Sequence, residues 1–167
     1  MKPGRKLSED CMHGNETQTA GNIALLAPVP LEHLLDAQQV LETEEKVAFG
    51  SQRYDLFRQL DKERNGQPVD VYIYASRREG QPEGETFWRA TYVEHVKSDL
   101  GVYPGDRRFR PKSTAGDTAF AVFWEVKALK PVAASEWCQP SGLTGFGKKK
   151  PYGQPFVPEG PILIQHP

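Results

Sequence analysis

The spacing of the apolar residues changes twice along the first half of the chain. Residues 23–27 (IALLA) are continuously apolar, which predicts a buried strand. This strand should end at the prolines of 28–30, because proline cannot continue a central strand. From Leu31 to Leu41 the leucines recur at nearly helical spacing, with acidic residues and glutamines between them. An amphipathic helix is therefore predicted there, fading through residues 43–45.

A second helix is predicted after residues 47–51, which interrupt the helical pattern. Ser51 can cap its N-terminus, and residues 65–68 (NGQP) are of the types that stop a helix. The larger apolar side chains recur on one face of this helix, at Tyr54, Phe57 and Leu60.

The apolar period then falls to two, which predicts strands. Residues 69–76 (VDVYIYAS) place two sets of side chains on opposite faces: Val69, Val71, Ile73 and Ala75 on one, and Asp70, Tyr72, Tyr74 and Ser76 on the other. Further strands are predicted at 86–96, 118–126 and 161–164, with a helical turn at 136–137. Loops are predicted at 77–85, at the basic segment 97–116, and at 139–160, which is rich in Gly, Pro and Lys.

This order of elements predicts an α+β fold, in which a small curled antiparallel β-barrel has two helices inserted after its first strand. The 167 residues suit one domain, which we assign to residues 22–167. Residues 1–21 are polar and show no apolar periodicity, so they are predicted to form a flexible N-terminal arm.

Composition excludes several classes of protein. No apolar run approaches the roughly 20 residues of a membrane helix, and two cysteines are too few for a disulfide scaffold. No apolar stretch follows the basic residues near the N-terminus, so no secretory signal is expected and a cytoplasmic location is the simplest. Cys11 and His13 lack a second pair of ligands nearby, so neither a metal site nor a cofactor is predicted.

The net charge of −1 conceals an asymmetry. Residues 31–63 contain 4 basic and 8 acidic residues, whereas residues 101–167 contain 9 basic and 5 acidic residues. The basic residues of the second half gather in two clusters, Arg107, Arg108, Arg110 and Lys112 in one, and Lys148, Lys149 and Lys150 in the other. Such clusters either bind a local anionic partner or simply solvate two loops, and the sequence leaves both interpretations open.

These segments resemble the PUA-like superfamily, and within it the EVE domains. The strand and leucine-rich helix of residues 23–41 are similar to the opening of the family pattern, and residues 49–60 (FGSQRYDLFRQL) to its second helix. Residues 69–76 are similar to the strand that enters the family's pocket. Residues 87–104 and 118–129 (TAFAVFWEVKAL) resemble its later strands, so the resemblance covers roughly residues 22–137.

The resemblance implies a reader domain that holds a flipped, often modified base in an aromatic pocket, with basic surface around the pocket for phosphates. Gln52 and Arg58 match polar positions in the segment that enters the family's second helix, and Ser76 matches a serine at the end of its pocket strand. The chain departs from the pattern at Gly50 and Ser51, where the family usually has Asn and Tyr, and at Ala75, where it usually has His. These departures leave the identity of the ligand open.

A flipped base must regain, by stacking and by hydrogen bonds to its edge, the free energy that leaving the stack costs. We therefore predict a ligand pocket from the aromatic and short polar residues of the matched segments, namely Phe49, Ser51, Gln52, Tyr54, Tyr74, Ser76 and Trp88. The first basic cluster is predicted to bind the phosphates of DNA or RNA, through Arg107, Arg108, Arg110 and Lys112. Trp124 alternates in phase with Phe120 and Val122, which favours a core position.

Two other functions stay open. Related PUA-like domains of the ASCH type include hydrolases of modified nucleosides, which use a lysine, a threonine or serine, and a glutamate. Glu125 with Thr91 or Ser76 would be the candidates, but Glu125 is more simply a solvated residue, and Lys46 falls in an acid-rich surface stretch. A protein-interaction module is the second alternative, and it predicts binding that tolerates salt.

Overall fold

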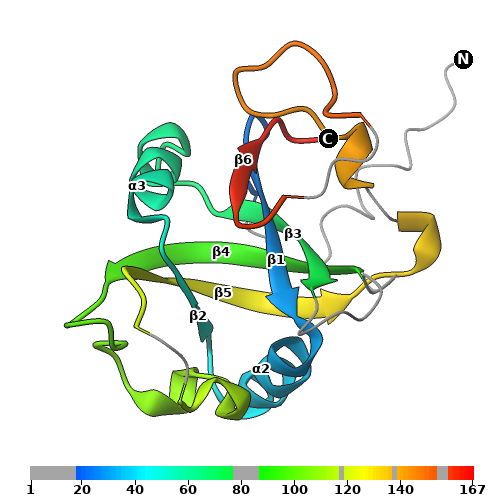
Figure 1. The fold of residues 1–167 in the computed structure, drawn as a ribbon. Coiled ribbons are helices and arrows are strands. Elements are labelled where there is room, and N and C mark those ends of the chain that lie inside the picture. Colours follow the sequence, from blue (N-terminus) through cyan, green and yellow to red (C-terminus); the bar gives the residue numbers. More distant parts are fainter. Residues whose placement is uncertain (1–17, 77–86, 117–118, 137–138, 154–157) are drawn as a thin grey trace, which may run out of the picture.

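The computed structural model describes residues 18–76, 87–116, 119–136, 139–153 and 158–167 (Figure 1). The helices and strands follow one another as β1 (Ala24–Pro30), α2 (Leu31–Thr43), β2 (Val47–Ser51), α3 (Tyr54–Glu63), β3 (Val69–Ser76), β4 (Phe87–Lys97), β5 (Val122–Pro131) and β6 (Ile162–Ile164). The described residues also form the 3-10 turns η1 (Arg107–Phe109), η2 (Lys112–Thr114), η3 (Ala134–Glu136) and η4 (Pro140–Gly142). The predicted α+β class is confirmed.

The six strands form one mixed sheet in the order β2-β5-β4-β3-β1-β6. Four of its pairings are antiparallel, but β1 and β3 run parallel, with Leu25 opposite Val71 and Pro30 opposite Ser76. The expectation of a wholly antiparallel sheet is therefore wrong. The long connection through α2, β2 and α3 returns the chain in its original direction, which is what a parallel pair requires.

The sheet curls into a half-barrel, as Figure 1 shows from the bend of β4 and β5. Their pairing shifts register twice, between Arg89 and Thr91 and again between Tyr92 and Glu94. Ala128 lies at the first shift with a positive φ of 55°. Such bulges bend a strand and increase its twist, so they account for the curl.

Strand β1 continues through the prolines that were expected to end it. Strand β6 pairs only with residues 24–26, so within the described residues the proline-containing end of β1 pairs on one side, with β3. Proline is tolerated on such an edge because a missing N–H there interrupts no second ladder. The prolines of 28–30 are thereby held in extended backbone directly before α2.

Strand β2 occupies residues that the sequence pattern presented only as an interruption between helices. It pairs with β5, with Phe49 opposite Trp124 and Gly50 opposite Phe123. A Cβ on Gly50 would lie 2.3 Å from the Phe120 ring, so a glycine is required for that ring to cross β2. A glycine in a five-residue strand weakens the strand pattern, which is why the sequence alone missed it.

Helix α3 presents its predicted face to the sheet. Leu56, Phe57 and Leu60 are buried, and the Phe57 ring stacks against both Tyr92 and Trp124, at centroid distances of 6.0 and 5.9 Å. The expected cap at Ser51 is wrong, because Arg53 is the N-cap residue. The Ser51 hydroxyl instead accepts a hydrogen bond from the Arg53 backbone N–H, at 3.1 Å, and orders the turn before the helix.

The alternation of each strand separates the buried side chains into three clusters. The main core lies between the sheet and the two helices and takes the side chains of β3 that were predicted to share one face, Val69, Val71, Ile73 and Ala75. Tyr72 and Tyr74 belong to a second cluster, together with Leu26, Leu143 and Ile164. Ala48, Tyr103, Phe109 and Phe123 form a third cluster, on which η1 packs.

The described residues near the N-terminus are held against the fold. Residues 1–17 of the predicted arm lie outside the described residues, but the arm does not extend to residue 21, because Ala20 is fully buried and its N–H donates to the Pro68 carbonyl at 2.8 Å. The predicted loop of 139–160, where described, folds back as a bridge from Thr144 to Pro151. The predicted loop 77–85 and residue 137 lie outside the described residues. Among the helices described, none is long and apolar enough to span a membrane.

Replacing Ala128 by glycine tests the strain at the bulge. A Cβ disfavours positive φ by about 1–2 kcal/mol, and glycine's greater entropy in the unfolded chain offsets part of this gain. We expect Ala128→Gly to raise the free energy of unfolding by up to about 1 kcal/mol in urea denaturation. Ala27→Gly, at a buried position of β1 where the pairing with β3 is regular, should lower it; equal losses for both variants would contradict a strained bulge.

Candidate functional site

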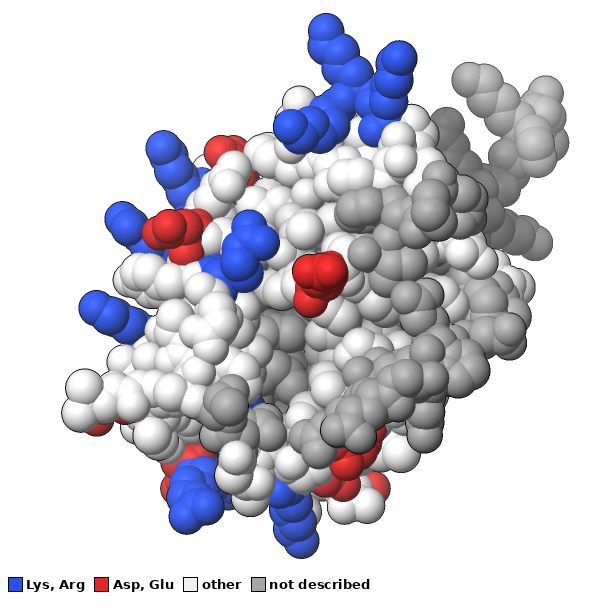
Figure 2. Space-filling view, viewed as in Figure 1, with Lys and Arg blue, Asp and Glu red and all other residues white. Residues whose placement is uncertain are grey.

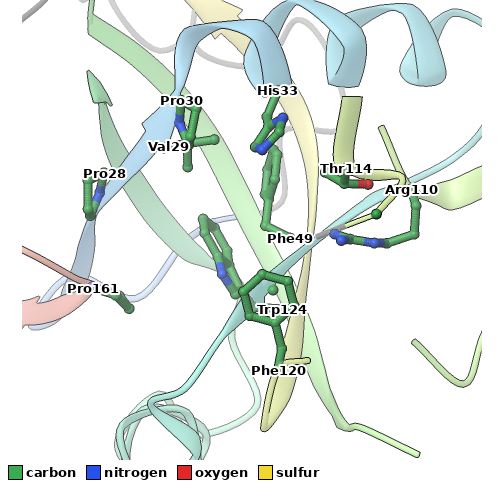
Figure 3. Close-up of a pocket in the computed structure, with 12 residues that line it drawn as sticks. Pro28, Val29, Pro30, His33, Phe49, Arg110, Thr114, Phe120, Trp124 and Pro161 are labelled. Carbon is green, nitrogen blue, oxygen red and sulfur yellow. The ribbon is translucent and has the colours of Figure 1, made fainter. Parts of the chain in front are cut away.

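A cavity of about 430 Å³ opens where the end of β1, the first turn of α2, β2 and the segment before β5 meet (Figure 3). We call it the main cavity. Its walls are mostly apolar, being formed by the aromatic residues Phe49, Phe120 and Trp124 together with Pro28, Val29, Pro30 and Pro161. Its polar side chains are His33, Arg110 and Thr114. The volume lies within the range of about 300–1,000 Å³ that is typical of small-molecule sites.

The aromatic wall is held by the sheet itself. Phe49 and Trp124 face each other across β2 and β5, with ring centroids 5.0 Å apart. Both side chains are nearly fully buried, and Trp124 also stacks on Phe57 of α3. Phe120 reaches the cavity over Gly50, where a side chain would exclude it. The wall is therefore rigid, because each ring is packed on its far side.

The polar groups of the cavity are held from its opposite side. The Arg110 guanidinium donates from Nη1 to the Ala48 carbonyl at 2.7 Å and lies 4.9 Å from the Phe123 ring centroid. Figure 3 shows it reaching toward the cavity from the η1–η2 side, beside Thr114. The Thr114 hydroxyl donates to the Pro111 carbonyl at 2.5 Å, so its oxygen presents lone pairs as acceptors.

Helix α2 fixes η2 against the cavity through two hydrogen bonds. His33, which is buried and lines the cavity, shares a hydrogen bond of 2.7 Å between its Nδ1 and the Ser113 hydroxyl. The Ser113 backbone N–H donates to the Asp36 carboxylate at 2.9 Å. These bonds join segments about 80 residues apart in the sequence and set the orientation of the His33 ring.

A second hollow of about 550 Å³ adjoins the main cavity, and we call it the basic hollow. The two share Arg110, Thr114, Gly116 and Phe120. Arg107 and Lys112 complete the basic side of the hollow, and both are exposed. In Figure 2 basic side chains project at the η1–η2 end of the molecule, and a separate group projects from the opposite end, over the loop near the C-terminus. Cations thus stand directly beside an aromatic cavity.

A part-buried ion pair adjoins the basic hollow through Tyr103, which lines the hollow. Glu125 is only 1% exposed, and its carboxylate contacts the Lys46 ammonium at 3.1 Å and accepts a hydrogen bond from the Tyr103 hydroxyl. Burial, and then this hydrogen bond and the charge of Glu125, raise the pKa of Tyr103 above its ordinary value. The expectation that Glu125 is solvated is wrong, because β5 turns it toward Lys46 and Tyr103.

Phe49 is the one member of the predicted ligand pocket that lines the main cavity. Ser51 is buried at the end of β2 against the Arg53 N–H, and Ser76 lies at the end of β3 opposite Pro30. Gln52 bonds to backbone instead, donating to the Ala119 carbonyl at 2.6 Å and accepting from the Ala121 N–H at 3.1 Å. It thereby positions the segment that carries Phe120.

Three predicted aromatic residues lie elsewhere in the fold. Tyr74 belongs to the second cluster, where its hydroxyl donates to the Pro158 carbonyl. Trp88 is 3% exposed in the main core, opposite Ile73, and Tyr54 packs against that core from the start of α3. None of the three lines the main cavity. Strand alternation sends Tyr74 to the face opposite Phe49, whereas Trp88 and Tyr54 pack in or against the main core.

Three of the four predicted phosphate-binding residues line the two hollows. Arg110 lines both hollows, and Arg107 and Lys112 line the basic hollow. Arg108 points away toward acidic partners, with its Nε 3.6 Å from a Glu44 oxygen and 3.8 Å from an Asp106 oxygen.

The predicted ligand pocket did not include the cavity's polar residues His33 and Thr114 or its aromatic residues Phe120 and Trp124. Trp124 was expected in the core, and it lies there with one side on the cavity. The alternation of Phe120 with Trp124 was a usable signal for a shared wall. No signal pointed to His33, because its partner Ser113 is distant in the sequence.

Compared with protein-family models, curated proteins and solved structures, the chain has no match in any of the three. The resemblance to EVE domains therefore remains an expectation from the sequence.

Glu94 adds a charge that depends on pH beside the buried carboxylate of Glu125. It lies opposite Glu125 in the β4–β5 register. Its pKa is raised, first by desolvation and then by a hydrogen bond with Glu125 and repulsion from that carboxylate. The folded protein therefore binds this proton more tightly than the unfolded chain does. Its stabilising effect is complete below the ordinary glutamate pKa and is lost as the pH rises through the raised value.

We therefore expect Glu94→Gln to raise the melting temperature at pH 7 and to leave it almost unchanged at pH 4. The reason is that glutamine keeps a hydrogen bond to Glu125 without the second charge. Melting curves recorded between pH 4 and 8 measure the difference. Glu42→Gln, on the exposed side of α2, removes the same charge without this partner, and an identical pH profile for both variants would exclude the Glu94–Glu125 interaction as the cause.

Proposed function

We propose that the protein binds nucleic acid and takes one flipped base into the main cavity, with neighbouring phosphates on the basic hollow. The observation that carries the proposal is the adjacency of the two: an aromatic cavity of about 430 Å³ and a cation-lined hollow share Arg110 and Phe120. A nucleotide has two parts that match these hollows: a flat base suits the aromatic cavity, and a phosphate a short distance away suits the cations.

The aromatic wall supplies what a displaced base requires. Leaving the stack costs a few kcal/mol, and stacking on an aromatic side chain returns about 1–3 kcal/mol per base. Phe49, Phe120 and Trp124 line the cavity, and packing behind Phe49 and Trp124 means that they lose little side-chain entropy when a base enters.

The cavity also carries groups suited to the polar edge of a base. Thr114 offers an acceptor oxygen, while His33 and Arg110 have nitrogen atoms at the wall. Polar groups at the wall of an apolar pocket fix orientation and discriminate between ligands, since a ligand that leaves them unpaired loses affinity. The resemblance to EVE domains favours a modified base, such as a methylated or hydroxymethylated cytosine.

The basic hollow suits phosphate contacts because its cations lie on a fixed segment. Asp106 caps η1 by accepting from the Arg108 N–H at 2.9 Å, and Phe109 is buried in the third cluster. Arg107 and Lys112 are carried by η1 and η2 and stay exposed. Contacts of this kind give affinity without sequence specificity and make binding depend on salt.

A hydrolase acting on a modified nucleoside is a second candidate, because Lys46, expected in an acid-rich surface stretch, pairs with the candidate glutamate Glu125. Lys46 lies 3.1 Å from Glu125, and neither residue lines the two hollows. Incubating the protein with free modified nucleosides, followed by chromatography of the products, tests this function. Turnover that disappears in Lys46→Arg, which keeps a cation beside Glu125, would favour the hydrolase over the reader.

Fluorescence polarisation with short labelled oligonucleotides tests the reader function. The panel should contain single and double strands, with and without methylated or hydroxymethylated cytosine, each at two salt concentrations. Saturable binding that weakens with salt and depends on the modification supports the proposal. Binding that tolerates salt, or no binding to any oligonucleotide, contradicts it.

Reversing two charges on the basic hollow should weaken binding at every sequence. We expect Arg107→Glu combined with Lys112→Glu to lower affinity and to reduce the slope of log K against log salt by about two, since each phosphate contact on a duplex contributes about 0.9. Lys149→Glu combined with Lys150→Glu makes the same change of charge in the loop near the C-terminus. Equal slopes for the two double variants would remove the basic hollow from the interface.

Truncating Phe120 should weaken the hold on the base itself. We expect Phe120→Ala to lower affinity for a flipped base by about 5- to 150-fold, the equivalent of one lost stacking contact. The salt slope should stay unchanged, because no phosphate contact is removed. Phe146→Ala is the control, because it truncates a second half-buried phenylalanine, one that packs on the main core and lines neither hollow. A similar loss in both variants would indicate general loosening of the fold and not a lost stacking partner.

A further inference from the structure

The turn after β4 has a backbone that its sequence does not favour. Asp99 and Val102 pair through two backbone hydrogen bonds of 2.8 and 3.0 Å, which leaves Leu100 and Gly101 as the central residues of a two-residue hairpin. Their φ values are +51° and +88°. Positive φ at both positions is the mark of a type I′ turn, whose first position favours Asn, Asp or Gly. Leucine pays a steric penalty there.

Leu100 is also almost wholly exposed. Its side chain is 96% accessible, and that of Val102 is 66% accessible. In Figure 1 the turn lies beyond the end of β4, on the side away from α2. An exposed leucine on strained backbone contributes neither packing nor solubility. Its presence is explained if the side chain meets something outside the chain.

The turn is fixed to the rim of the proposed interface. The Phe120 N–H donates to the Gly101 carbonyl at 3.1 Å, and Gly101 packs so closely on Ala119 that a Cβ would lie 2.3 Å from that residue's own. Gly101 and Val102 line the basic hollow together with Arg107 and Lys112. The apolar tip is thus rigidly joined to the segment that carries Phe120 into the main cavity.

We propose that Leu100 acts as a wedge that enters the base stack of a double-stranded nucleic acid when a base is flipped into the main cavity. This inference rests on the proposed function and deepens it, because it names the substrate class as duplex. Proteins that kink or open a duplex insert apolar side chains of this kind between base steps. The inserted side chain occupies space that the displaced base leaves and delays its return.

The charged residues beside this turn favour nucleic acid over a protein as the partner that Leu100 contacts. Arg107 and Lys112 are the exposed charged residues lining the hollow beside Val102, and both are positive. The exposed acidic residue Asp99 precedes Leu100, so the cations stand on the side of the tip that faces the hollow. An apolar tip beside such a hollow suits a surface whose rim is phosphate and whose interior is stacked bases. A rigid turn also suits this task better than a mobile one, because insertion then costs less conformational entropy.

The substitution Leu100→Asn tests the role of the wedge in binding without destabilising the fold. Asparagine relieves the backbone strain and removes the exposed apolar surface, so the melting temperature should not fall. We expect affinity for a fully paired duplex to drop about tenfold or more, because the cost of unstacking is no longer offset. The loss should be smaller on a duplex with one mismatch, where opening costs less, and within about twofold on the single strand.

Leu35→Gln is the matched control, since Leu35 is 49% exposed on α2 and lines neither hollow. Its affinities should match those of the wild type on all three oligonucleotides. An unchanged duplex affinity in Leu100→Asn, or an equal loss on single and double strands, would overturn the wedge while leaving the base cavity standing. Failure of the wild-type protein to bind any of the oligonucleotides would overturn the proposed function and the wedge with it.

Discussion

The carboxylate of Glu125 constrains how the rest of the site is arranged. It is buried in the middle of the sheet, where an unpaired charge would be strongly destabilising. Lys46, just before β2, and Tyr103, within the basic segment 97–116, supply the cation and the hydroxyl that satisfy it. The contacts of Glu125 therefore anchor both β2, which carries Phe49, and the basic segment to β5.

The two halves of the proposed interface follow from that anchoring. After Tyr103 in the sequence, Phe109 packs into the third cluster and Arg110 turns back to donate to the Ala48 carbonyl. The guanidinium then stands between the aromatic cavity and the basic hollow. The parallel pairing of β1 and β3 closes the other side, since it delivers the prolines of 28–30 and the first turn of α2 to the cavity.

Local patterns predicted the elements better than they predicted the site. Period-two alternation in residues 69–76 correctly separated the two faces of β3, and helical spacing correctly identified the buried face of α3. The parallel pairing, the strand β2 and the contact of His33 with Ser113 could not be read from the sequence, because each depends on contacts between distant segments. The pocket prediction therefore kept Phe49 but grouped it with Tyr74, which lies on the opposite face of the sheet.

Trp124 provides the most direct measurement, because it lines the cavity. Replacing Trp88 and Trp137 by phenylalanine leaves Trp124 as the sole tryptophan, and its emission can be followed while an oligonucleotide carrying the preferred base is added. A base stacked in the cavity should quench this emission in a saturable manner, with the same midpoint as the polarisation signal. Binding seen by polarisation without any change in Trp124 emission would contradict the placement of the base in the main cavity.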